Sequence, residues 1–129
     1  MQRWLSLSES AIDEAALVGS RPASSTSGAV LCFSGVVRNF ERDKPIEGID
    51  YEAFQAMAGH QFQLLFDELE SRWSVESVRL VHRVGRVPAG ETSLWVEVRS
   101  PHRGEALAAL AWLIDQMKQR VPIWKHPYL

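Results

Sequence analysis

The fold is indicated most clearly by residues 93–120, which read SLWVEVRSPHRGEALAALAWLIDQMKQR. Apolar and polar residues alternate over Ser93–Arg99, as is typical of a strand. Apolar residues then recur at helical spacing over Arg103–Arg120. Pro122 prevents this helix from continuing, because proline lacks an amide hydrogen and clashes with the preceding turn. The stretch therefore predicts a strand followed closely by a long helix.

The same periodicities place the other elements along the chain. We expect strands at 4–8, 28–37, 46–53, 75–84 and 93–99, and helices at 9–18, 55–73 and 103–120. The helix at 55–73 should bury one face, made of Phe62, Leu65, Phe66 and Leu69. This order predicts one α+β domain over residues 1–129, with a mostly antiparallel sheet and about three helices.

The connections carry their own local signals. Ser8 is expected to cap the helix at 9–18, and a polar loop should follow over 20–27. Residues 28–37 are apolar on both faces, which predicts a buried strand. Arg38–Lys44 is expected to form a charged loop, and Gly85–Gly90 a turn between two strands.

The composition excludes several classes of protein. The net charge of −2 and the pI of about 6.1 speak against a general nucleic-acid role. No apolar run reaches the roughly 18 residues of a membrane span, and no signal-peptide core follows Met1–Trp4. The only cysteine, Cys32, lies in an apolar run and is interpreted as a packed thiol rather than a nucleophile. A chain without an intrachain disulfide fits a reducing compartment, so we expect a cytoplasmic protein.

One charged residue continues an apolar stripe on the last predicted helix. Leu107, Ala111, Ile114 and Lys118 are spaced so that they share one side of that helix. A lysine there should be partly desolvated, and desolvation favours a neutral amine that can act as base or nucleophile. Alternatively, Lys118 extends into solvent and complements the negative end of the helix dipole.

Two cationic residues, His102 and Arg103, stand where the same helix begins. The free amide groups and positive dipole of a helix start make, together with these side chains, a good site for phosphate or carboxylate. The alternative is a surface pair without a ligand. Arg103 and Lys118 lie roughly 22 Å apart at 1.5 Å per residue. One small substrate cannot bridge them within one chain, so they serve different sites or two copies build a shared one.

Two further cations are candidates for a site. Lys125 follows the rigid, aromatic Pro122-Ile123-Trp124, which should hold its amine better than a loose tail would. The alternative is a solvated lysine near the chain end. Arg38 follows a predicted strand and opens a loop, a usual position for a functional side chain, although it can equally be a plain surface arginine.

Together these residues resemble the large, catalytic subunit of molybdopterin synthase, the MoaE family. The similarity runs over residues 28–125 in blocks that occur in the family's order and spacing. The blocks are Gly28-Ala29-Val30, Phe33–Arg38, Tyr51–Phe54, Met57-Ala58, Val81–Val87, Gly90-Glu91, Ser100–Arg103, Lys118 and Pro122–Lys125.

The resemblance implies a fold of the α/β-hammerhead type with an added sheet. It implies a homodimer at the centre of a heterotetramer, with a small ubiquitin-like sulfur-carrier subunit at each end. The carrier's C-terminal Gly-Gly thiocarboxylate would supply two sulfurs to cyclic pyranopterin monophosphate, which would form the dithiolene of molybdopterin. By matched position, Lys118 and Lys125 correspond to the family's essential lysines. Arg38, His102 and Arg103 correspond to its substrate-anion residues.

One departure concerns the residues after Lys125. The family usually continues with another basic residue and then an acid, whereas this sequence continues His126-Pro127-Tyr128-Leu129. We expect this difference to affect contacts with the ligand or small subunit rather than the core chemistry. No cofactor is expected, and no metal, because no His/Cys/Asp cluster has ligand spacing. The rival interpretations are a non-catalytic module that binds the carrier tail, and a hydrolase of phosphorylated small molecules.

Overall fold

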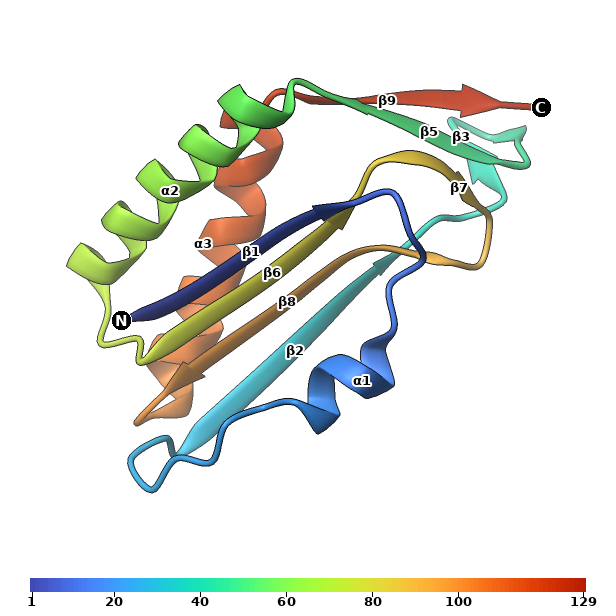
Figure 1. Ribbon diagram of the computed structural model, residues 1–129. Helices are drawn as coiled ribbons and strands as arrows, with labels where there is room; N and C mark the ends of the chain where they lie inside the picture. The colour runs from blue at the N-terminus through green and yellow to red at the C-terminus, as the bar shows by residue number, and fades with distance from the viewer.

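A computed structural model describes residues 1–129 and contains three helices and three small sheets (Figure 1). The helices are α1 (Glu14–Gly19), α2 (Gln55–Arg72) and α3 (Arg103–Arg120). The strands are β1 (Gln2–Ser8), β2 (Ala29–Val36), β3 (Phe40–Glu41), β4 (Lys44–Pro45), β5 (Gly48–Ala53), β6 (Ser77–Arg83), β7 (Gly85–Pro88), β8 (Thr92–Ser100) and β9 (Ile123–Tyr128). All pairs except β1 with β6 are antiparallel. The predicted α+β class is therefore confirmed.

The main layer is a four-stranded sheet in the order β1-β6-β8-β2, with α2 and α3 on one face (Figure 1). The predicted buried face of α2 is confirmed, since Phe62, Leu65, Phe66 and Leu69 are all fully buried. They pack in one core with residues of the sheet and of α3, including Leu113. Burial of a side chain of this size contributes roughly 1.5–3 kcal/mol, so this core fixes both helices on the sheet.

A second sheet, in the order β7-β5-β9, lies at one end of the molecule (Figure 1). Its small core consists of Val37, Ile49, Tyr51 and Val87. The prediction of a turn over residues 85–90 is wrong for residues 85–88, because Gly85–Pro88 forms β7 and pairs with β5. Strand β9 was not expected at all; it pairs with β5 over six residues on the other side. Both strands are short, and their long-range partners stabilise them more than their own sequence does.

Three local expectations need correction. Helix α1 starts later than predicted, because Asp13 caps it by accepting a hydrogen bond from the Ala16 amide at 3.0 Å. Strand β2 is an edge strand rather than a buried one, and Val36 on its outer face is 52% exposed. The thiol of Cys32 lies on this same open face and is exposed rather than packed.

The charged segment after β2 is a tight hairpin rather than an irregular loop. Strands β3 and β4 pair antiparallel, and Arg42 and Asp43 between them have φ angles of 49° and 63°. Two consecutive positive φ angles are the backbone signature of a two-residue hairpin turn. No helix of the structure is both long enough and apolar enough to cross a membrane.

Candidate active site

A cavity of about 540 Å³ lies where the two sheets meet the end of α3. Its size falls within the usual range for a small-molecule site. Three of the predicted site residues, Arg38, Lys118 and Lys125, line it together. The rest of its wall is mostly apolar, with a few polar groups; it includes Phe33, Val37, Glu41, Ile49, Tyr51, His82, Ser93, Ile114, Met117 and Ile123.

Three different elements bring these cations to one place. Arg38 follows β2, and its guanidinium carbon lies 5.0 Å from the centre of the Phe40 ring. Lys118 stands in the last turn of α3, and Lys125 lies in β9 opposite Tyr51 of β5. None of the three cations forms a salt bridge within the chain. The cavity therefore presents positive charge that is free to meet an anion.

The predicted environment of Lys118 is wrong in one respect. The buried face of α3 consists of Ala106, Ala109, Leu113 and Met117, one position away from the expected stripe. Leu107 is 55% exposed, and Lys118 is exposed too. Desolvation by the core thus does not set the chemistry of Lys118, and its importance rests on its place at the cavity.

His102 and Arg103 lie outside the cavity. Both are exposed at the first turn of α3, and the His102 side chain makes no capping hydrogen bond. Neither side chain has an ion-pair partner in the chain. A single chain therefore separates this cationic pair from Lys118 and Lys125, as the length of the helix predicts.

The cavity also contains buried polar groups to which the sequence analysis gave no role. The Tyr51 hydroxyl donates to Ser93 Oγ at 3.2 Å, and the Ser93 hydroxyl donates to the Gly35 carbonyl at 3.3 Å. Burial raises the pKa of Tyr51, and the bond to Ser93 opposes this rise. His82 is only 6% exposed, and its ring meets that of Tyr51 edge-on at 5.1 Å between centroids. The sequence carried one indication of a role for these residues: His82 and Tyr51 both lie in blocks that resemble the MoaE family.

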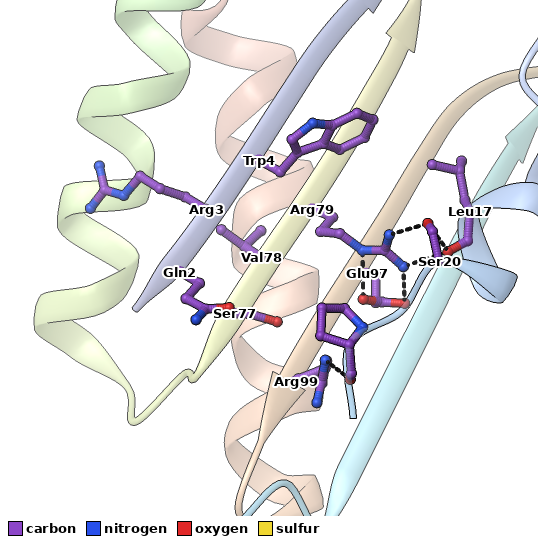
Figure 2. A pocket seen from close by; sticks show the side chains of 11 residues that line it. Gln2, Arg3, Trp4, Leu17, Ser20, Ser77, Val78, Arg79, Glu97 and Arg99 are labelled. Atoms are coloured by element: carbon purple, nitrogen blue, oxygen red, sulfur yellow. Dashed lines mark hydrogen bonds and ion pairs between the residues drawn. The ribbon is translucent and has the colours of Figure 1, made fainter. Parts of the chain in front are cut away.

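A second cavity, of about 370 Å³, lies on the face of the four-stranded sheet that points away from α2 and α3 (Figure 2). At its floor the fully buried Glu97 accepts two hydrogen bonds from Arg79, both at 2.9 Å, and one from Arg21 at 2.7 Å. Arg79 also donates to the Leu17 carbonyl and to Ser20. Burial acts to raise the pKa of Glu97, but the hydrogen bonds from both arginines outweigh it and lower the pKa. Arg21, Arg79 and Glu97 thus form one ion-pair network, which we call the clamp around Glu97. Because Arg79 also bonds to Leu17 and Ser20, this clamp holds α1 to the sheet.

Cys32 lies beside this clamp. Its sulfur is 3.3 Å from Nη2 of Arg21 and 3.9 Å from the Glu97 carboxylate. Although Cys32 is exposed as a residue, partial desolvation of its thiol and the charge of Glu97 raise the pKa of the thiol, which disfavours the reactive thiolate. The structure contains no group of three or more His, Cys, Asp and Glu side chains placed to hold a metal ion.

Comparisons with known proteins identify the family of the chain. The family model described as MoaE protein matches residues 7–120. The chain belongs to the MoaE family. Among curated relatives, the molybdopterin synthase catalytic subunit of Nostoc sp. is 40% identical over 102 residues, covering 78% of this chain and 62% of the relative. This MoaE chain thus spans less than two thirds of that relative's length.

Solved structures share the fold. The molybdopterin synthase structure from Staphylococcus aureus superposes with a TM-score of 0.83 at 28% identity, covering 96% of this chain and 88% of that one. A chain from the complex of subunits 1 and 2 of molybdopterin-converting factor from Helicobacter pylori has a TM-score of 0.81 at 24% identity, with 95% and 83% covered. These likenesses support the architecture derived above for this MoaE chain.

Proposed function

We propose that this chain is the catalytic subunit of a molybdopterin synthase. It transfers sulfur from the C-terminal thiocarboxylate of a small ubiquitin-like carrier subunit to cyclic pyranopterin monophosphate, and so forms the dithiolene of molybdopterin. The observation that carries the proposal is the convergence of Arg38, Lys118 and Lys125 on one cavity without internal salt bridges. The family and the name of the Nostoc relative support it.

The chemistry fits the residues at the cavity. The carrier brings the sulfur nucleophile, so this chain needs no reactive cysteine or serine of its own. It needs cations that attract a phosphate and a carboxylate, and an amine near the reacting carbons. Lys118 meets the second need as a general acid and base, or by taking the spent carrier's acyl group as a transient amide. Lys125 and Arg38 add positive charge where anionic groups enter.

The complete site is proposed to need two copies of this chain, as a homodimer inside a heterotetramer. His102 and Arg103 of one copy then complete the anion site beside Lys118 and Lys125 of the other. Leu107, Ala108 and Ala111 are exposed on α3 between the cationic pair and Lys118. An exposed apolar strip of this kind is suited to contact between subunits, and a two-fold axis can bring one helix start toward another helix end.

A reconstituted assay tests the function. The chain is mixed with a thiocarboxylated carrier and cyclic pyranopterin monophosphate, and molybdopterin is measured. We expect conversion that requires the carrier and is lost in Lys118→Ala. Carrier binding without conversion would instead indicate a non-catalytic binding module. Phosphate release without any carrier would indicate a hydrolase.

We propose that the reaction takes place in the cytoplasm. The chain has a single cysteine and so cannot form an internal disulfide, which fits a reducing compartment.

A further inference from the structure

Glu41 is the only carboxylate among the side chains that line the cavity of Arg38, Lys118 and Lys125. It forms no salt bridge within the chain, and neither do these three cations. One acid and three cations thus share a cavity without neutralising one another. A partly buried carboxylate that its own chain leaves without an ion-pair partner is available to a ligand.

The hairpin offers Glu41 a partner, which it does not take. Lys44 is its direct cross-strand partner in the pair of β3 and β4, and opposite charges at such positions attract each other. Lys44 forms no salt bridge with Glu41 and does not line the cavity. Burial is the main cause that raises the pKa of Tyr51, the bond to Ser93 opposes it, and the charge of Glu41 raises it further. Glu41 therefore acts on the cavity rather than along the hairpin.

Backbone hydrogen bonds on both sides of the hairpin hold Glu41 in this position. The Ile46 amide donates to the Asn39 carbonyl at 3.0 Å and closes the base of the hairpin. Before the hairpin, Val37 is buried, and its amide donates to the Glu91 carbonyl at 3.0 Å. The acid is thus carried by a short, anchored hairpin, which favours a defined direction of approach to a ligand.

The proposed substrate has a donor pair that such an acid recognises. The ring N3–H and the 2-amino group of a pterin are adjacent donors on one edge of the ring, and a carboxylate offers two acceptor oxygens to such a pair. Lysine and arginine side chains are donors only, so the cations of the cavity cannot bind this edge. Most of the remaining wall is apolar, which suits a flat ring.

We propose that Glu41 is a specificity-determining residue, whose carboxylate accepts two hydrogen bonds from the amino-pyrimidinone edge of the pterin. The cations then remain for the phosphate at the other end of the substrate and for the carboxyl end of the carrier. The proposal rests on the proposed function for the identity of the substrate, whereas recognition of a pterin edge can be measured without sulfur transfer.

Recognition is tested on the full chain with two rings that carry no phosphate: a pterin, and the corresponding lumazine, in which a carbonyl oxygen replaces the 2-amino group. Fluorescence titration gives both affinities. The wild type should bind the pterin about ten- to hundred-fold more tightly, because the lumazine carbonyl cannot donate to the carboxylate. Glu41→Gln should lose or invert this preference, since its amide can donate to the lumazine carbonyl. Glu47→Gln, the same change at an exposed residue that does not line the cavity, should keep it.

The proposal is overturned if the wild type binds neither ring or binds both equally. It is also overturned if Glu41→Gln keeps the wild-type preference, or weakens both rings alike as a structural defect would. In the reconstituted assay, Glu41→Gln should raise KM for cyclic pyranopterin monophosphate about ten- to hundred-fold and change kcat little. If the wild type prefers the pterin but converts no substrate, the proposed function fails and the pterin site stands. If it converts substrate and Glu41→Gln has the same KM, the function stands and the role of Glu41 fails.

Discussion

Lys118 of α3 and Lys125 of β9 line one cavity, although one belongs to the helical layer and the other to the second sheet. Only Val121 and Pro122 separate the two elements along the chain. Val121 is buried and packs in the main core. The packing of Val121 thus fixes the backbone of the connection between the two lysines, which favours a preorganised site.

Lys118 is the first residue to test. Lys118→Ala should reduce molybdopterin formation by about 10²–10⁴-fold, the usual contribution of a general acid or base. Its free energy of unfolding should change by less than about 0.5 kcal/mol, because the side chain is exposed. The matched control is Gln119→Ala at the next exposed position, which should keep full turnover. Near-normal turnover of Lys118→Ala would remove this residue from the mechanism, and Lys125→Ala is also expected to be severe.

The anion residues should act on substrate affinity. Arg103→Ala and Arg38→Ala should each weaken binding of cyclic pyranopterin monophosphate about ten- to hundred-fold, since a hydrogen bond to a charged group contributes about 1.5–3 kcal/mol. Carrier binding should change less. Isothermal titration measures both affinities, and Lys44→Ala, an exposed cation that does not line the cavity, serves as control. An unchanged substrate affinity in Arg103→Ala would leave the cationic pair without this role.

Complementation tests the shared site. Inactive Lys118→Ala and Arg103→Ala chains are mixed and allowed to exchange subunits, and exchange is confirmed by native mass spectrometry. Heterodimers should regain activity, because one of their two sites contains only wild-type residues. If exchange occurs without recovered activity, His102 and Arg103 serve something other than the substrate on which Lys118 acts.

The clamp around Glu97 predicts a large effect on stability. Glu97→Gln removes the negative charge from between Arg21 and Arg79 and should lower the free energy of unfolding by about 3–5 kcal/mol, as expected when a buried ion pair loses one partner. Glu91→Gln is the control: its ion pair with Arg83 is more exposed, with Glu91 46% exposed, and should contribute at most about 1 kcal/mol. Urea unfolding of both variants at pH 7 gives the comparison, and equal losses would contradict the clamp.

Stability should also depend on pH through His82. Its pKa in the folded protein is lower than the ordinary value near 6.5, so the unfolded chain binds this proton first as the pH falls. The free energy of unfolding should therefore decrease below about pH 6.5 and stop responding to this group below its folded pKa. His82→Asn should lack this component. Urea unfolding at pH 7.5 and 5.5 measures it, and an identical pH response in the variant would contradict a buried, neutral imidazole.

Much of the fold could be predicted because helices carry a local signal. The bounds of α3 match the expected residues, and α2 differs only at its last residue. Phe62, Leu65 and their neighbours repeat at helical spacing whatever they pack against. Pro122 ends α3 for a reason confined to its own backbone. The five candidate cations were also visible in the sequence, because their residue types and family spacing are local facts.

Only the tertiary structure decided the rest. Strands β7 and β9 are held by β5, and the edge position of β2 follows from which strands pair, which depends on residues far away in the chain. Local spacing also misplaced the buried face of α3 by one position, since the packing of the helix on the sheet selects that face. The grouping of Arg38, Lys118 and Lys125 at one cavity, with Arg103 left outside, likewise depends on how the two sheets meet the end of α3. Sequence determines which residues repeat along an element, whereas long-range pairing determines what those residues face.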